Sequence, residues 1–292
     1  MALRLLSMAR LPACKMAGMT QTHIEPFVGQ VLAPRTFAAT PQLLATYRGG
    51  LAVDPQTWAP QMLANAADTT LLFSQQRGHL WLRHEWEFHG RIEPGGTYTA
   101  QTRVTDIYPR RDRTILLSET ELRDAGGVLI SLQRHHQSFL LDNPPAGEVA
   151  LRDPASKEGA GRAMPPMVRE LASLERTVTL EMCGEFFYGS KNYHSDRAQS
   201  EALGFRDVVV GGRMTMGYVG ELLDATLGQR WARTGRLLVK FTNVLWPGEP
   251  IRVSIGLGEP PADDPTRETV LGRVEKADGT VVIVAEGSVA RV

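Results

Sequence analysis

The stretch GGRMTMGYVGELLDATLG, residues 211–228, decides the fold. Two glycines precede a run in which apolar side chains recur at helical spacing. One stripe is formed by Met214, Tyr218, Leu222 and Ala225, and it is widened by Val219 and Leu223. The spacing predicts a long helix with one apolar face. Such a face has to pack against another layer of structure, and the segments that follow indicate which.

Strand-like segments follow this helix. They are RLLVKFTNVLW (236–246), IRVSIGLG (251–258) after the turn PGEP, and a final pair in 269–292. Val, Ile, Leu, Thr and aromatic residues dominate them, as is typical of antiparallel strands. No helical pattern lies between successive strands, which argues against a parallel α/β fold. The second half therefore predicts one helix packed across a curved antiparallel sheet.

The first half repeats this order. A helix candidate at 55–73 precedes strand candidates at 80–88, 97–108 and, as a hairpin, 114–141. The two final hairpins share a turn with glycine where a positive φ is wanted, RDAGG at 123–127 and KADGT at 276–280. One helix on a curved antiparallel sheet is the hotdog architecture. The repeat predicts an α+β protein built of two fused hotdogs.

A segment rich in Pro, Gly and charge separates the halves at about residues 141–167 and predicts a linker. We expect an amino-terminal hotdog half at 24–142, a linker at 143–167 and a carboxy-terminal half at 168–292. Residues 1–23 are expected to be an unstructured or mis-assigned extension, with Met19 as the natural start.

The first 24 residues carry Arg4, Arg10 and Lys15 but no acid before Glu25, so a targeting peptide is the alternative. Because Arg10 interrupts the apolar stretch, a secretory signal is disfavoured. We expect a cytoplasmic protein, with a mitochondrial location as the alternative.

Bulk composition restricts the partners. Lys+Arg and Asp+Glu both number 32, and this balance argues against a nucleic-acid-binding protein. The two cysteines have no metal-ligand or disulfide-framework spacing. No run of about 18 apolar residues is present, so no membrane span is expected.

The segment KNYHSD, residues 191–196, holds the only histidine after residue 136. We interpret 195–205 as a short helix with Ser195 as its N-cap, Asp196 at the favourable end of the helix dipole and Gly204 closing it. His194 then lies on a loop just before a helix, where a rigid scaffold positions functional groups. Its imidazole can move a proton near neutral pH. We interpret Asp196 as a helix-start residue instead of a catalytic acid.

Gly211 and Gly212 stand directly before the long helix. Free N–H groups at a helix start attract a developing negative charge, and glycine lets a substrate carbonyl approach the backbone closely. These two residues are therefore candidates for holding a thioester oxygen. Tight contact between helix and sheet is the alternative explanation, and both can hold together.

A series of residues runs from His194-x-Asp196 through Ala198, Gly204-Phe205 and Val208–Val210 to Gly212, and a strand, a Pro-Gly turn and a second strand follow it. Together they resemble the MaoC-like hydratase/dehydratase family of hotdog proteins, which includes (R)-specific enoyl-CoA hydratases. The resemblance covers about residues 25–292 except the linker.

The family's hydratase motif is Asp-x-Asn-Pro-x-His. In it His194 matches the histidine and Asn192 the asparagine, whereas Gly189 or Ser190 stands where the acid is expected. The resemblance thus implies His194, Asn192 and Ser190 as catalytic candidates. Glu185 is the nearest upstream acid.

The resemblance implies a lyase that hydrates 2-enoyl-CoA or dehydrates 3-hydroxyacyl-CoA, without metal or cofactor. The substrate is expected to be a thioester of CoA or of acyl carrier protein. The first half has no counterpart of NYHSD and is expected to form a wall of the acyl tunnel, which leaves one site per chain. A homodimer is possible.

Two alternatives stay open. A hotdog thioesterase would use a carboxylate on the long helix, for which Glu221 and Asp224 are candidates, although they lie far along it. A non-catalytic acyl-CoA-binding subunit is the other. The remaining strand histidines are no metal ligands: His84 and His89 are five residues apart and face opposite ways, and His135 and His136 are ordinary strand residues.

Overall fold

The computed structural model describes residues 26–51, 80–110, 113–140, 165–187, 189 and 191–291. The helix expected at 55–73, residues 1–23 and most of the linker lie outside these ranges. In chain order the elements are β1 (Arg35–Ala38), α1 (Pro41–Leu51), β2 (Leu80–Phe88), β3 (Thr97–Arg110), β4 (Arg113–Asp124), β5 (Leu129–Leu140), β6 (Arg169–Thr177), α2 (Leu180–Phe186), α3 (Arg197–Ala202), α4 (Gly212–Thr234), β7 (Arg236–Phe241), β8 (Pro250–Leu257), β9 (Arg267–Lys276) and β10 (Val281–Ala290). None of the helices in these ranges is long and apolar enough to cross a membrane.

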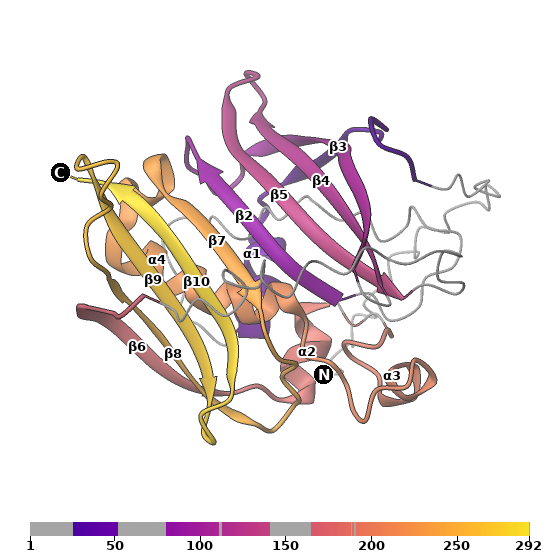
Figure 1. Ribbon diagram of the computed structural model, residues 1–292. Coiled ribbons are helices and arrows are strands. Elements are labelled where there is room, and N and C mark those ends of the chain that lie inside the picture. Colours follow the sequence, from indigo (N-terminus) through magenta and orange to yellow (C-terminus); the bar gives the residue numbers. More distant parts are fainter. Residues whose placement is uncertain are drawn as a thin grey trace, which may run out of the picture.

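The described strands form one antiparallel sheet of ten, in the order β1-β3-β4-β5-β2-β7-β10-β9-β8-β6 (Figure 1). Read from either edge inward, the two halves have the same order. They join where β2 pairs with β7, with His84 opposite Val239. The double hotdog predicted from the repeat is confirmed, with the pairing between its halves made inside one chain. The shared hairpin turns are also confirmed, since Gly127 and Gly279 have φ of 82° and 84°.

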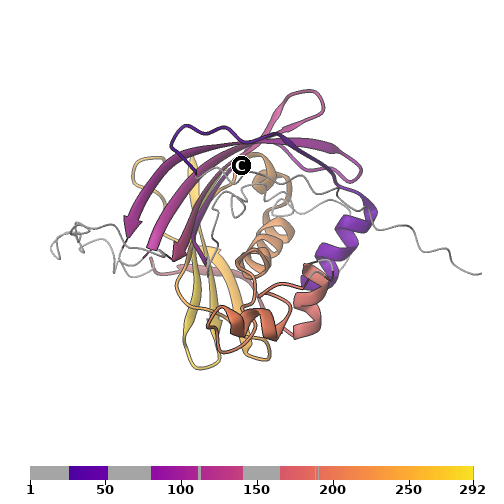
Figure 2. The same ribbon diagram turned by 90° about the vertical axis from the view of Figure 1, so that its right-hand side faces the viewer.

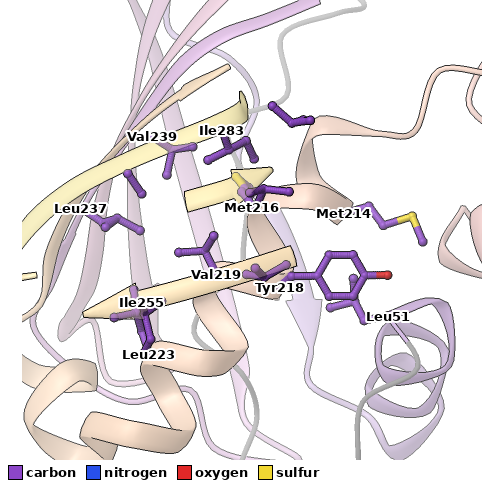
Figure 3. Packing of buried hydrophobic residues seen from close by; sticks show 14 of the residues in the cluster. Leu51, Met214, Met216, Tyr218, Val219, Leu223, Leu237, Val239, Ile255 and Ile283 are labelled. Carbon is purple, nitrogen blue, oxygen red and sulfur yellow. The ribbon is translucent and has the colours of Figure 1, made fainter. Parts of the chain in front are cut away.

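Helix α4 lies inside the curve of this sheet (Figure 2). The helix buries Met214, Tyr218, Val219 and Leu223, as the spacing predicted. Figure 3 shows Val219 and Leu223 beside residues of the strands, whereas the ring of Tyr218 points toward Leu51 of helix α1. Burial of each such side chain contributes about 1.5–3 kcal/mol. The predicted stripe was too wide, because Leu222 is only half-buried and Ala225 is exposed.

Helix α4 also runs past the end predicted at Gly228. At that residue the backbone turns to φ 52° and ψ −128°, and a further helical stretch follows to Thr234. Glycine adopts this conformation without the steric penalty that a side chain would incur. The glycine taken as the end of the helix is therefore a kink, and Trp231 beyond it is buried in the core.

Two helices were missed. Helix α2 is capped by Thr179, whose side chain accepts from the Met182 N–H. Helix α1 starts the same way, with the Leu43 N–H donating to Thr40 Oγ1 at 3.2 Å. The two helices lie side by side, with the rings of Tyr47 and Phe186 5.7 Å apart. This pairing positions the segment that leads to His194.

Candidate active site

Hydrogen bonds within the segment 191–196 fix its shape. The Asn192 side-chain Oδ1 accepts from the His194 N–H at 2.8 Å, and the Asn192 carbonyl oxygen accepts from the Ser195 and Asp196 N–H groups. Such side-chain to backbone bonds are typical of Asx turns. The turn presents His194 at the point where helix α3 begins.

Helix α3 is capped by Asp196, whose Oδ1 accepts from the Gln199 N–H at 3.1 Å. The interpretation of Asp196 as a helix-start residue is confirmed. The choice of Ser195 as N-cap was wrong by one residue, because the Ser195 hydroxyl accepts from the Asn192 N–H at 3.2 Å instead. Gly204, with φ 82°, follows the end of the helix as expected.

The His194 ring is held in one orientation. Its Nδ1 lies 2.7 Å from the Val209 carbonyl oxygen. Because a carbonyl can only accept, Nδ1 carries the proton in this bond and Nε2 is the basic nitrogen of the neutral ring. The neighbouring backbone adds a second tie, from the Val209 N–H to the Tyr193 carbonyl.

Two aromatic rings pack against the imidazole. The ring of Phe187 is stacked on it, with centroids 4.8 Å apart and planes inclined by 11°. The ring of Tyr193 lies 3.9 Å away. Phe187 in turn lies over Gly211, where an added Cβ would come within 2.5 Å of its Cζ. His194 and the start of α4 are thus packed onto the same ring.

His194 faces a cavity of about 270 Å³. The cavity lies between the loop carrying His194, the start of α4 and the two central strands β2 and β7. Its lining is Leu80, Trp81, Tyr193, His194, Val209, Val210, Gly212, Thr215, Phe241, Thr242, Asn243, Val244, Leu245 and Val282. These described lining residues include an imidazole, hydroxyls and an amide, but no carboxylate. The pocket is thus mostly apolar, with a few convergent polar groups, as expected of a small-molecule site.

Of the two glycines at the start of α4, Gly212 lines the cavity. A Cβ on Gly212 would lie 3.2 Å from Trp81 and Phe241 side-chain atoms, so tight contact with the sheet explains this glycine on its own. The Thr215 side-chain hydroxyl donates to the Gly212 carbonyl at 3.1 Å and keeps the first turn regular. The backbone N–H groups of this turn provide the positive end of the helix dipole beside His194.

The other catalytic candidates lie as follows. Ser190 is outside the described residues. Asn192 uses its Oδ1 to shape the turn. Glu185 is exposed, and its carboxylate lies beside Gly49 of helix α1 instead of in the cavity lining.

The two carboxylates of helix α4 also lie away from the cavity. Glu221 and Asp224 are buried and face helix α1, and neither lines the cavity. Burial, and then the charge of Asp224, raise the pKa of Glu221 to about 8, while Arg48 and the Tyr47 hydroxyl act in the opposite direction. Glu221 is therefore protonated at neutral pH.

Two histidines next to the cavity were not recognised from the sequence. His84 and His135 are opposite each other on β2 and β5 and are both fully buried. The cavity residue Trp81 contacts both rings, with centroids 5.2 Å from His84 and 4.1 Å from His135. Opposite facing of His84 and His89 is confirmed, since His89 is exposed. The register of β2 against β5 was the missing information.

A comparison with models of protein families finds none that matches the chain. In sequence, the chain is similar to the enoyl-CoA hydratase ChsH3 of Mycobacterium tuberculosis, with 24% identity over 221 residues, which are 74% of this chain and 72% of the relative. In structure, it is similar to a MaoC-like dehydratase with a TM-score of 0.69 and 14% identity, over 91% of this chain and 98% of the other. The chain has the fold of the MaoC-like dehydratases.

Two further structures support this conclusion. A MaoC-like dehydratase from Phytophthora capsici has a TM-score of 0.63 at 16% identity, over 90% of this chain and 95% of that one. A conserved Mycobacterium tuberculosis protein with a double hotdog fold has a TM-score of 0.57 at 14% identity, over 91% and 96%. The resemblance to the MaoC-like family read from the sequence is confirmed at the level of the fold. The relative in sequence is named an enoyl-CoA hydratase, and two of these similar structures are named dehydratases.

Proposed function

We propose that this MaoC-like protein is a hydro-lyase that adds water reversibly across the double bond of a 2-enoyl thioester. The observation that carries the proposal is the bond from His194 Nδ1 to the Val209 carbonyl oxygen. This bond leaves Nε2 as the basic nitrogen of a histidine that lines a cavity beside a helix start.

In the hydration direction, Nε2 of His194 takes a proton from water as the oxygen bonds to the β-carbon. The electron pair of the double bond moves toward the thioester carbonyl, whose oxygen becomes negative. Backbone N–H groups at Gly211 and Gly212 are proposed to stabilise that charge, which such donors do best when they are fixed in advance. The imidazolium then gives its proton to the α-carbon, which restores the neutral ring. Dehydration is the reverse, and neither direction uses a metal or a cofactor.

Asn192 and Ser190 have supporting parts in the proposal. Asn192 holds the turn that carries His194, through the 2.8 Å bond from the His194 N–H to its Oδ1. Ser190 is proposed to help hold the reacting water, in the place where the MaoC-like motif has an acid. The substrate is proposed to be a thioester of CoA or of acyl carrier protein.

Hydrolysis of the thioester is the less favoured chemistry, because Glu221 and Asp224 face helix α1 and do not line the cavity. One experiment separates the possibilities. Purified protein is mixed with trans-2-octenoyl-CoA while the absorbance of the conjugated enoyl group and the release of free thiol are followed together. Loss of absorbance without thiol release supports the hydro-lyase. Thiol release would establish a thioesterase, and binding with neither change would establish a non-catalytic subunit.

A further inference from the structure

The inward face of the sheet changes character between the halves. One row of paired residues crosses β3, β4, β5 and β2 as Val104, Ser118, His135 and His84. The same row continues across β7, β10, β9 and β8 as Val239, Ala285, Gly272 and Ile255. Because directly paired residues share one face of a sheet, this row lies on a single surface. The row is polar at Ser118, His135 and His84 of the first half and apolar throughout the second.

The next row repeats the change. Thr102, Thr120 and Gln133 lead to Trp86 on β2 and then to Leu237 on β7. The three polar residues are buried, and the Thr102 and Thr120 hydroxyls are hydrogen-bonded to each other at 2.8 Å. Buried strand positions are usually apolar, so two adjacent polar rows need a specific reason.

Some of these polar atoms have no partner within the described structure. His84 and Ser118 are both fully buried. Within the described structure, neither the two ring nitrogens of His84 nor the Oγ of Ser118 makes a hydrogen bond. The Gln133 side chain acts on the His84 ring as a hydrogen-bond partner and raises its pKa, but it does not reach full bonding geometry with either ring nitrogen. Leaving buried polar groups unsatisfied costs free energy, which is recovered when a ligand supplies the missing bonds.

The polar rows adjoin the cavity that holds His194. Trp81 forms part of the cavity wall, and its ring contacts both His84 and His135. An acyl chain that entered past His194 and continued beyond Trp81 would approach these rows.

The polar rows also carry no charge. Burial, followed by the proximity of His135, lowers the pKa of His84 well below its usual range, so this ring is neutral. The other polar side chains of the two rows are hydroxyls, an amide and a second imidazole, with no Lys or Arg among them. A carboxylate brought to this surface would lose its water without gaining a cation in return.

We propose that the acyl group of the substrate carries an uncharged oxygen, a ketone or a hydroxyl, beyond the reacting double bond, and that Ser118 and His84 bind this oxygen. The inference rests on the proposed function only in taking the ligand to be an acyl thioester. Ser118 and His84 act on the choice of substrate and not on the reacting carbons.

The test compares octanoyl-CoA with its 5-oxo, 6-oxo and 7-oxo counterparts as ligands, by calorimetry. These saturated thioesters cannot be hydrated, so their binding is independent of the proposed reaction. The corresponding trans-2-enoyl thioesters are then assayed for hydration. We expect at least one oxo compound to bind about tenfold more tightly than octanoyl-CoA, the effect of about one hydrogen bond to a buried group.

In Ser118→Ala and in His84→Phe this preference is expected to fall toward onefold, with plain octanoyl-CoA bound at least as well as by the wild type. His136→Phe is the matched control, since His136 is on the opposite face of β5 and contacts Glu85. Its preference is expected to stay at the wild-type value. Thermal melts of each variant establish that it is folded.

Equal binding of all four thioesters by the wild type would overturn the inference, and this result needs no variant to fold. A preference that survives in both Ser118→Ala and His84→Phe would also overturn it. Selective binding without hydration of any enoyl thioester would refute the proposed function and leave the inference standing. Hydration of the enoyl thioesters without any preference for an oxo compound would support the proposed function and overturn the inference.

Discussion

The ring of Phe187 occupies the space that a side chain on Gly211 would need: its Cζ lies 2.5 Å from the position of an added Cβ. The same ring is stacked on the imidazole of His194. One aromatic side chain therefore sets the distance between the proposed base and the proposed oxyanion donors. The two groups cannot shift independently.

Gly211→Ala is expected to displace Phe187 and, with it, His194. We expect a loss of about 1–3 kcal/mol in the free energy of unfolding, as for other overpacked sites. Hydration activity should fall by about a hundredfold, because small displacements of reacting groups carry costs of that size. Gly184→Ala is the control, since an added Cβ there meets nothing within 4 Å. Recovery of stability but not of activity in Gly211→Ala/Phe187→Ala would identify the Phe187 contact as the cause.

His194→Gln is expected to lower the rate of hydration by about 10²–10⁴-fold, the usual contribution of a general acid–base group. The amide can keep a hydrogen bond to the Val209 carbonyl but cannot take a proton from water. The thermal melting temperature should change little. The exposed His89 provides the control His89→Gln, with unchanged activity expected. Full activity of His194→Gln would show that the base is elsewhere.

Variants of Asp196 can distinguish a helix cap from a catalytic acid. Asp196→Asn keeps an oxygen that can accept from the Gln199 N–H, so we expect near wild-type stability and activity. Asp196→Ala removes the cap and should cost about 1 kcal/mol, measured by chemical denaturation. If the asparagine variant lost activity while it remained as stable as the wild type, the carboxylate would have a chemical role.

Glu221 makes the stability depend on pH. Its pKa rises from 4.5 to about 8 on folding, so the folded chain keeps a proton that the unfolded chain releases. The free energy of unfolding should therefore decrease as the pH rises from 4.5 to about 8, and the full decrease is reached above that range. Glu221→Gln should match the wild type at low pH and exceed it above pH 8 by on the order of a few kcal/mol.

Thermal melts from low to high pH measure this difference. Glu175→Gln, at an exposed position of the edge strand β6, is the control for the loss of a carboxylate at the surface. A parallel pH dependence of wild type and Glu221→Gln would contradict the assignment of the proton to Glu221.

The alternation of residues in the strands and the apolar stripe of α4 predicted the two hotdogs, because burial of one face repeats visibly along the chain. The position of His194 before α3 followed from the residues that start and end short helices. Helix α2 escaped detection because seven residues are too few for a period to show. Its formation depends on the Thr179 cap and on packing of Phe186 against Tyr47 of helix α1.

The contacts that shape the site could not be predicted from the sequence for a different reason. Phe187 lies between His194 and Gly211 because the turns between these residues bring the three together in space. No spacing in the sequence predicts that arrangement. The pairing of His84 with His135 depends on a register between strands about fifty residues apart. For the same reason, the polar rows were invisible until β2, β4 and β5 were placed side by side.

The pairing of β2 with β7 lets the two halves of the sheet differ. In a symmetric dimer of single hotdogs, every substitution appears twice, once on each side of the axis. A serine introduced to receive a ligand on one side would also disrupt the apolar packing behind the long helix on the other. Here a single peptide chain crosses the seam, so Ser118 can face one half of the interior while Ile255 faces the other. Selectivity can be altered on one side while the catalytic side stays as it is.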